Sequence, residues 1–419
     1  MNQEIRTKIE TIKAGQVPEG YKKTKIGVVP SEWNDIKFSK LFDEYSNYTE
    51  DLSKYPLYSL TIEEGVIPKT DRYERSHLVK KENAYKIVPQ NHFVYNPMNV
   101  RFGAVARYLG DNPVAVSGYY DVFVTKQYSD GAFMDSFLIS PKMISYYNRV
   151  STGSLVEKQR VHFSQFMEFN LPLPSKLERE KIAEILSTQD RVITLKEERI
   201  EAKKQQKKYL NFSILNISKN EGKVCSLNNF IKLKSGYAFK SKNYVDNGKY
   251  KVITIANVQK NKMCMDRTNT LDKLPSNIQK HQLLQRGDIL VSLTGNVGRV
   301  CSVNLDDCLL NQRVGKIEIL DNSLKDYIYC LLQDEKFIYS MQKAAQGAAQ
   351  GNLANDDINE YVICIPYKDK SIDYQKINKI VAILSTADRE IELLERDLEQ
   401  EKQKKKALMQ LLLTGIVRV

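Results

Sequence analysis

One helical segment of 38 residues occurs twice in this chain, and the duplication limits its possible folds more than any other feature. Residues 178–215 align with residues 376–413 at an offset of 198, and 18 of the 38 positions are identical. The shared positions include a whole Ile-Leu-Ser-Thr run, which begins at Ile185 and again at Ile383. Self-similarity at a fixed offset is the signature of an internal repeat. The chain is therefore expected to consist of two related halves.

Both copies have the apolar periodicity of a long amphipathic helix. Neither contains Gly or Pro, and a helix of this length would extend for about 57 Å. The predicted seam comprises Ile182, Leu186, Ile193, Ile200 and Leu210 in the first copy and Ile380, Leu384, Ile391, Leu394, Leu398 and Leu408 in the second. Such a stripe needs an apolar partner, and the other copy offers a matching one. The sequence predicts an antiparallel coiled coil; the alternative is that each helix packs on its own domain.

The residues ahead of each helix are rich in strand and turn patterns. PVAVSGYYDVFVT (113–125) and GDILVSLTG (287–295) are typical of strands that end in polar turns. EFNLPLP (168–174) also matches EYVICIP (360–366). The predicted fold class is α+β: two β-rich domains separated and joined by two long helices, with a pseudo-twofold repeat. The expected divisions are an N-terminal helix at 1–17, a first domain at 18–175, a first long helix at 176–217, a second domain at 218–370 and a second long helix at 371–419.

Composition favours a polyanionic partner and argues against several classes of protein. The formal net charge is +12, an excess that suits nucleic acid. The lysines at 203–208 and 402–406 are nevertheless expected to form a solvated helix face or protein contacts. No apolar run could span a membrane and the N-terminus has no apolar core of a signal peptide, so a cytoplasmic protein is expected. The six cysteines form no CxxC pair, which favours reduced thiols and no metal site.

The sequence contains no recognisable catalytic motif. It has no GxxxxGK[ST] phosphate loop and no GxGxxG after a strand. Asn96-Pro97-Met98-Asn99 lacks the second Pro and the aromatic residue of the motif with which amino-methyltransferases hold their target. The chain is therefore predicted to be non-catalytic.

The loops instead offer hydrogen-bonding and stacking groups that suit DNA. Arg and Lys read guanine, Asn and Gln read adenine, and cations hold phosphates. The candidate DNA-binding residues are Tyr95, Asn96, Arg101, Ser117, Tyr119, Tyr120, Lys158, Gln159 and Arg160 in the first half and Lys234, Ser235, Tyr237, Lys240, Thr294, Asn296, Arg299, Asn311, Gln312 and Arg313 in the second. Any one of these loops could be an ordinary polar turn. Their occurrence at matching places in two duplicated domains favours a shared function.

The whole layout resembles the specificity subunit of Type I restriction–modification enzymes. The resemblance covers nearly the full chain and rests on PEGYKKTKIGVVPSEW (18–33), FVYNPMNVRFG (93–103), KLKSGYAFKSKNY (232–244), the paired KIAEILSTQD and KIVAILSTAD, and the C-terminal KKKALMQLLLTGIVRV. It implies two target-recognition domains that each read one part of a split, asymmetric site in double-stranded DNA, with the two helices as a ruler between them.

The resemblance also implies partners and cofactors. Two modification subunits would hold S-adenosylmethionine and methylate adenine N6, and restriction subunits would use ATP and Mg, while this chain would hold no cofactor or metal. Two other hypotheses stay open at this point. The chain could be an autonomous DNA methyltransferase or nuclease with its own recognition domains, or a coiled-coil scaffold that never touches DNA.

Overall fold

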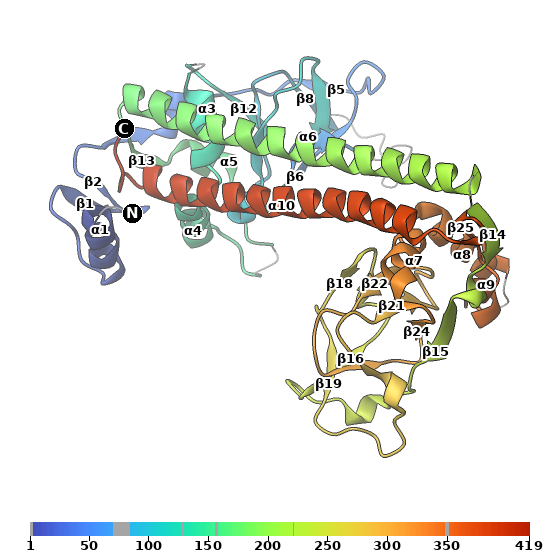
Figure 1. Ribbon diagram of the computed structural model, residues 1–419. Helices are drawn as coiled ribbons and strands as arrows, with labels where there is room; N and C mark the ends of the chain where they lie inside the picture. The colour runs from blue at the N-terminus through green and yellow to red at the C-terminus, as the bar shows by residue number, and fades with distance from the viewer. Residues whose placement is uncertain (1–2, 70–83, 128, 156–157, 221, 348–351) are drawn as a thin grey trace. The chain divides into compact units, whose positions relative to one another are not determined.

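Contacts between residues divide the chain into two compact units. Unit 1 comprises Met1–Glu198 with Arg396–Val419, and unit 2 comprises Arg199–Glu395. The computed structural model describes residues 3–69, 84–127, 129–155, 158–220, 222–347 and 352–419 (Figure 1). Both unit boundaries fall inside the two long helices, α6 (Lys176–Asn220) and α10 (Tyr374–Leu412). Each unit therefore contains one β-rich region and one half of the helix pair.

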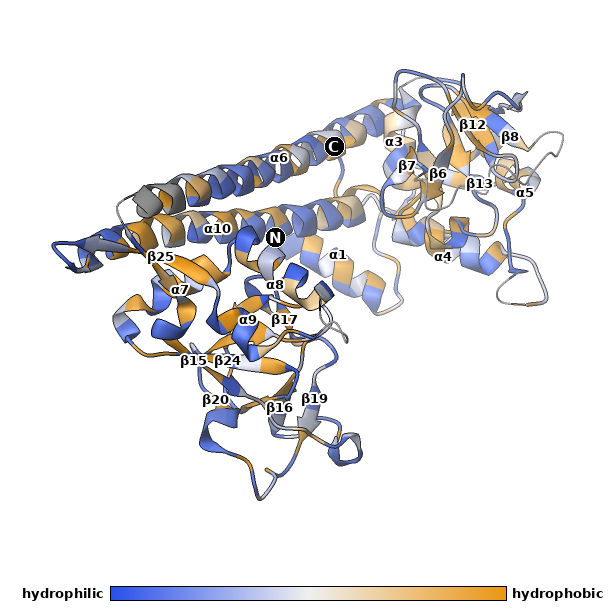
Figure 2. Ribbon diagram, turned by 90° about the vertical axis from the view of Figure 1, so that its right-hand side faces the viewer, coloured by the Kyte–Doolittle hydropathy of each residue, from blue (hydrophilic) through white to orange (hydrophobic). Residues whose placement is uncertain are grey.

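The two long helices pair in antiparallel orientation, as predicted. Cross-helix ion pairs join Asp190 to Lys405 in unit 1 and Lys207 to Asp388 in unit 2. As residue numbers rise along α6, the numbers of their partners on α10 fall. Figure 2 shows that polar residues predominate along both helices, so each has only a narrow apolar stripe to bury. The pairing covers that stripe on both partners.

Two ion pairs between the helices occur twice, related by the pseudo-twofold repeat of the sequence. Glu197 lies 2.7 Å from the Lys402 ammonium in unit 1, and Glu395, its repeat equivalent, lies 2.6 Å from Lys204 in unit 2. The Asp190–Lys405 and Asp388–Lys207 pairs are related in the same way. The expected solvated face is confirmed for Lys204, Lys208, Lys402, Lys404 and Lys406, which are exposed. The sequence did not predict that most of the clustered lysines also neutralise carboxylates of the opposite helix. Each such exposed pair stabilises by about 0–1 kcal/mol.

The predicted seam is buried, and both of its ends continue into a domain core. Ile182, Leu186, Ile200, Ile380 and Leu384 are buried, and Ile193, Leu210, Ile391, Leu394, Leu398 and Leu408 are half-buried. Ile182 belongs to the core of unit 1 and Ile380 to the core of unit 2. The coiled coil and the alternative of packing on the domains are thus both realised, in different turns of the same helices.

Unit 1 is built on a four-stranded sheet in the order β10-β9-β12-β4. Its elements are α1 (Gln3–Lys13), β1 (Tyr21–Thr24), β2 (Gly27–Pro30), β3 (Asn34–Lys37), α2 (Phe38–Leu41), β4 (Phe42–Glu44), β5 (Tyr48–Thr49), β6 (Tyr58–Thr61), β7 (Gly65–Pro68), β8 (Tyr85–Val88), β9 (Phe93–Tyr95), η3 (Val100–Phe102), β10 (Val105–Arg107), β11 (Val114–Ser117), β12 (Asp121–Thr125), α3 (Asp130–Phe137), α4 (Pro141–Val150), α5 (Phe163–Met167) and β13 (Asn170–Leu173). Aromatic rings dominate its core, where Phe42, Phe123 and Phe166 make mutual ring contacts.

Unit 2 repeats this plan on a sheet in the order β15-β24-β21-β22. Its elements are β14 (Gly222–Ser226), η5 (Leu227–Asn229), β15 (Ile231–Ser235), η6 (Ser241–Asn243), β16 (Tyr250–Ile253), β17 (Val258–Gln259), β18 (Lys262–Met263), β19 (Asn269–Leu271), η7 (Lys280–Gln282), β20 (Leu283–Leu284), β21 (Ile289–Ser292), β22 (Val300–Ser302), β23 (Cys308–Leu310), β24 (Val314–Ile319), η8 (Asn322–Leu324), α7 (Lys325–Leu332), α8 (Glu335–Gly347), α9 (Asn355–Asn359), β25 (Val362–Lys368) and β26 (Ser371–Ile372). β14 pairs with β25 as β3 pairs with β13. Strands β4, β9, β10 and β12 thus correspond to β15, β21, β22 and β24.

The predicted strands are confirmed, and each β-rich region also contains helices that were not predicted from the sequence. α3 and α4 follow the sheet in unit 1, and α7 and α8 follow it in unit 2. All six cysteines are free thiols. The N-terminal segment forms the expected helix α1, where Lys8 lies over the ring of Tyr21, and the Tyr21 hydroxyl donates to the Gly415 carbonyl at 2.8 Å.

The anchoring of the helix ends predicts a large contrast between two leucines of α6. Leu186 is 1% exposed and Leu195 is 55% exposed. Leu186→Ala should lower the free energy of unfolding by about 2–5 kcal/mol because it leaves a cavity in the core of unit 1. Leu195→Ala, the matched control on the same helix, should change it by less than about 0.5 kcal/mol. Urea unfolding followed by circular dichroism measures both, and equal losses would contradict the anchoring.

Candidate nucleic-acid interface

Three loops meet at one end of the central sheet in unit 1. Loop A (96–104) joins β9 to β10, loop B (117–121) joins β11 to β12, and loop C (151–162) joins α4 to α5. Loops A and B are neighbours because β12 pairs with β9, with Asp121 opposite Tyr95. Loop C is held to loop A by a hydrogen bond of 2.9 Å from the Val161 N–H to the Pro97 carbonyl. Tyr95 adds a second bond, from its hydroxyl to the Val161 carbonyl, also at 2.9 Å.

Unit 2 builds three corresponding loops, in which one bond between loops C and A and one bond within loop B recur. Here loop A is 292–299, loop B is 311–314, and the described part of loop C is 352–354. The Leu353 N–H donates to the Leu293 carbonyl at 2.8 Å, which repeats the bond between loops C and A in unit 1. In loop B the Asn311 side chain accepts from the Arg313 N–H at 3.1 Å, as the Ser117 hydroxyl accepts from the Tyr119 N–H at 3.4 Å. These shared bonds define equivalent positions in the two units.

Equivalent positions of the two units carry different side chains. Tyr119 stands where unit 2 has Arg313, and both are exposed. Arg160 precedes the bond between loops C and A in unit 1, and Asn352 takes that position in unit 2. One unit therefore presents a phenol and a guanidinium where the other presents a guanidinium and a carboxamide. The hydrogen bonds that shape the loops are alike in the two units, but the side chains that the loops expose differ.

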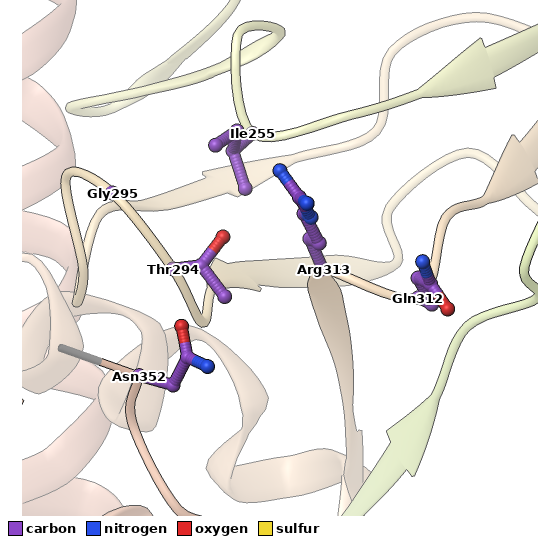
Figure 3. Close-up of a pocket in the computed structure, with 6 residues that line it drawn as sticks. All are labelled: Ile255, Thr294, Gly295, Gln312, Arg313 and Asn352. Atoms are coloured by element: carbon purple, nitrogen blue, oxygen red, sulfur yellow. The ribbon is translucent and has the colours of Figure 1, made fainter. Parts of the chain in front are cut away.

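In unit 2 residues of the three loops line an open pocket with a volume of about 510 Å³. Its lining comes from loop A (Thr294, Gly295), loop B (Gln312, Arg313), loop C (Asn352) and the segment after β16 (Ile255). Figure 3 shows the side chains of Thr294, Arg313, Ile255 and Asn352 around one space, with Gln312 to the side. The lining combines one cation with carboxamides, a hydroxyl and an apolar side chain. These side chains can hydrogen-bond to a polar ligand that has a flat edge.

The comparison with known proteins identifies the family. The family model described as the Type I restriction modification DNA specificity domain matches residues 37–204 and again residues 219–402. The chain belongs to this family of Type I restriction–modification specificity subunits. It is a non-catalytic subunit of that class, with one DNA specificity domain in each half. Both matches run through a β-rich region and into the long helix that follows it.

Named relatives and solved structures agree with the family. The MjaVIII specificity subunit of Methanocaldococcus jannaschii is 27% identical over 61% of this chain and 63% of its own length, just under two thirds. The MjaIX specificity subunit of the same organism is 23% identical over 83% of this chain and 86% of its own. The crystal structure of a Type I restriction–modification S subunit from M. genitalium covers 91% of this chain and 96% of its own, with a TM-score of 0.54 at 14% identity, and supports the fold.

Several predicted DNA contacts of the specificity subunit prove to be structural. Tyr95 is fully buried, so the prediction that it binds DNA is wrong; it ties loop C to the sheet. The side-chain oxygen of Asn96 accepts hydrogen bonds from the backbone N–H groups of Met98 and Asn99 and so shapes loop A. Arg101 is 8% exposed and donates to the Gln159 side chain at 2.7 Å. Its guanidinium joins loops A and C instead of facing outward.

The remaining candidates of unit 1 lie at the surface of loops B and C. Tyr119 and Lys158 are exposed, and Arg160 and Tyr120 are half-buried. Burial raises the pKa of the Tyr120 hydroxyl, with a further increase from Tyr119. Asp121, which ends loop B, has its pKa raised by burial despite the opposing effect of the Lys86 ammonium 3.3 Å away. The exposed Tyr119 phenol and Lys158 ammonium can therefore contact a ligand.

The second half of the specificity subunit divides its candidates in the same way. Thr294, Gln312 and Arg313 meet in the pocket. The Tyr237 N–H donates to the Leu310 carbonyl of β23, its carbonyl accepts from the Gln312 N–H of loop B, and its hydroxyl donates to the Asn277 side chain at 2.7 Å. The other candidates lie outside the pocket. Ser235, Lys240 and Asn296 are exposed, and Asn311 lies inside loop B. Lys234 lies 3.5 Å from the Glu318 carboxylate, and Arg299 donates to the Gln259 side chain at 2.5 Å.

Sequence reasoning missed Ile255 and Asn352. Asn352 could have been found by counting, because it precedes Glu360 by eight residues as Arg160 precedes Glu168. Ile255 gives no such signal: its segment does have an equivalent in the first half, because β16 pairs parallel with β23 as Leu57 pairs with Ala115 of β11, but only the folded structure shows that Ile255 lines the pocket. In the part of the chain that the structure describes, no group of His, Cys, Asp or Glu side chains is placed to hold a metal ion. No helix among those residues is long and apolar enough to cross a membrane.

Gly236 permits the close approach of the β15 end to loop B, and this predicts a specific cost. A Cβ added there would lie 2.1 Å from the carbonyl oxygen and 2.3 Å from the carbonyl carbon of Asn311. Gly236→Ala should displace loop B and lower the free energy of unfolding by about 1–3 kcal/mol. Gly347→Ala is the matched control, because no atom of the described residues lies within 4 Å of its added Cβ. Urea unfolding compares them, and equal stability of the two variants would refute the close approach.

Proposed function

We propose that this specificity subunit reads an asymmetric DNA site in two parts, with one unit on each part. The observation that carries the proposal is the repeated frame of loops A, B and C with different side chains at equivalent positions, such as Tyr119 and Arg313. Equal frames suit the same duplex geometry in both halves. Unequal side chains suit different bases.

Double-stranded DNA is the ligand that this chemistry favours. The chain has a net charge of +12, which suits a phosphate backbone. Its loops add Arg, Tyr, Gln and Asn side chains that bond or stack with base edges. Access to chromosomal DNA requires that the subunit work in the cytoplasm.

The helix pair then acts as a ruler between the two parts of the site. Two related modules on one scaffold favour half-sites separated by about one helical turn, roughly 34 Å. Because α6 and α10 have no Gly or Pro within the repeat, they form a stiff spacer. The distance between recognised bases would follow from helix length, and the bases themselves from the loops.

Catalysis would come from partner subunits bound to this one. We infer two modification subunits that hold S-adenosylmethionine and methylate adenine N6, and restriction subunits that use ATP and Mg. A solved relative, which covers 96% of this chain with a TM-score of 0.51 at 13% identity, is described as a structural basis for complex assembly and conformational transition of the type I system. In this arrangement the specificity subunit holds no cofactor and decides only which adenine is presented.

The surface of the helix pair supports the idea of two copies of one partner. Leu195 and Leu393 occupy equivalent positions in the repeat, and both are 55% exposed. Thr188 and Thr386 are also equivalent and exposed, on the same helix faces. The exposed leucine does not stabilise the helix pair, so its presence in both copies suits two equivalent docking sites.

Methylome sequencing tests the proposed recognition. A host would express the modification subunit with this chain, and again without it. We expect a split, asymmetric N6-methyladenine motif that disappears when the chain is omitted, because the modification subunit alone cannot choose a site. The same data give both half-sites and the gap between them. An unchanged methylation pattern in a demonstrably active complex would refute the proposal.

The docking sites predict a stepwise loss of partner copies. Leu195→Arg or Leu393→Arg alone should leave one modification subunit on the chain, and the double variant should leave none, because a buried unpaired charge opposes docking. Native mass spectrometry of the purified complex counts the copies. Leu177→Arg, at an exposed leucine that the repeat does not share, is the control and should retain two. Full stoichiometry in the double variant would exclude this surface.

A further inference from the structure

The pocket of unit 2 contains an arginine that is held at its backbone and free at its tip. The Arg313 N–H donates to the Asn311 side chain at 3.1 Å, and its carbonyl accepts from the Leu293 N–H at 3.0 Å. Within the described residues its guanidinium has no ion-pair or hydrogen-bond partner. Arg101, Arg107 and Arg299, which also lie beside the sheets, all donate to side chains of this chain. Arg313 is therefore positioned for a ligand and not for the fold.

A second polar group in the same pocket also lacks a partner. The Thr294 hydroxyl is buried and makes no hydrogen bond within the described residues. Buried polar groups are nearly always bonded, so an unpaired one calls for an explanation. Thr294 lines the pocket from loop A while Arg313 lines it from loop B. Figure 3 shows the Thr294 hydroxyl on the side of its residue that faces Arg313. A ligand between the two loops would satisfy both groups at once.

The lining of the pocket suits a base edge better than a phosphate. Phosphate sites gather several cations or backbone N–H groups, whereas Arg313 is the single cation among the six lining residues. The other polar groups are a hydroxyl and carboxamides, and Ile255 provides an apolar wall. An arginine guanidinium donates two parallel hydrogen bonds to O6 and N7 of guanine, the commonest specific contact with a base.

We infer that this pocket takes the major-groove edge of one guanine, with Arg313 as the donor to the base and Thr294 as a second contact. The inference rests on the proposed function. It adds the base recognised at one position of one half-site and the residues that recognise it. Unit 1 has Tyr119 at the position of Arg313 and cannot make the two-pronged contact. This particular guanine requirement therefore belongs to the half-site of unit 2, and the equivalent position of the other half-site should not share it.

The test uses the whole complex with its modification partner. Methylation rates are measured on duplexes in which each base pair of the wild-type site is replaced in turn. Arg313→Ala should reduce the preference for guanine at one position by roughly 5- to 150-fold and leave every other position unchanged. The affected half-site should be the one that does not respond to Arg160→Ala in loop C of unit 1. Arg286→Ala is the matched control, because Arg286 pairs with Asp306 on the surface of unit 2 outside the pocket.

Thr294→Val separates a ligand contact from a structural role. Valine has nearly the same shape, and the hydroxyl that it removes has no hydrogen-bond partner among the described residues. The melting temperature of the chain should therefore stay the same or rise, while discrimination falls at the Arg313-dependent position or its neighbour. A lower melting temperature with unchanged discrimination would overturn the role of Thr294.

Two other outcomes decide against the inference as a whole. A uniform loss of methylation on all duplexes in Arg313→Ala would indicate a phosphate contact, and unchanged discrimination would exclude Arg313 from recognition. Both differ from failure of the proposed function, in which the wild-type chain itself would impose no motif on its partner.

Discussion

The antiparallel pairing of α6 with α10 is the interaction on which the rest of the structure depends. Each helix would leave an apolar stripe in water by itself, and pairing covers both stripes at once. The pairing also returns the end of the chain to unit 1, where Leu412 and Leu413 join a core built mostly from the first 186 residues. Each core includes residues of both helices, taken from its own end of the pair.

Polar contacts set the register of that pairing. Two ion pairs recur by the pseudo-twofold relation, whereas a third contact does not. The buried Gln189 side chain donates to the Glu401 carboxylate at 2.7 Å, and its repeat equivalent is Ala387. Apolar seams tolerate slippage, but a buried amide that loses its acceptor does not. The repeated contacts therefore make the two halves alike, and contacts without a repeat, such as Gln189–Glu401 and Lys196–Asp397, distinguish them.

Divergence of the loops on a common frame follows from where the hydrogen bonds lie. Loops A, B and C are joined mainly through backbone groups, such as the Val161–Pro97 and Leu353–Leu293 bonds. Backbone bonds do not depend on the side chain at the same residue, so Tyr119 and Arg313 can occupy one position without altering the loop. Recognition chemistry can thus change while the fold does not.

The sequence alone determined the two long helices, their seam and the main strands, because these follow from periodicity. It also determined that the two halves share one plan, since 18 identical positions in 38 have no other explanation. Only the tertiary structure showed that Tyr95 is core, that Arg101 bonds Gln159, and that the lysine clusters pair across the helices. Only the tertiary structure likewise brought Ile255 and Asn352 to Thr294 and Arg313. Periodicity reports which face of an element is apolar, but the partner of a polar side chain depends on which distant segments folding places beside it.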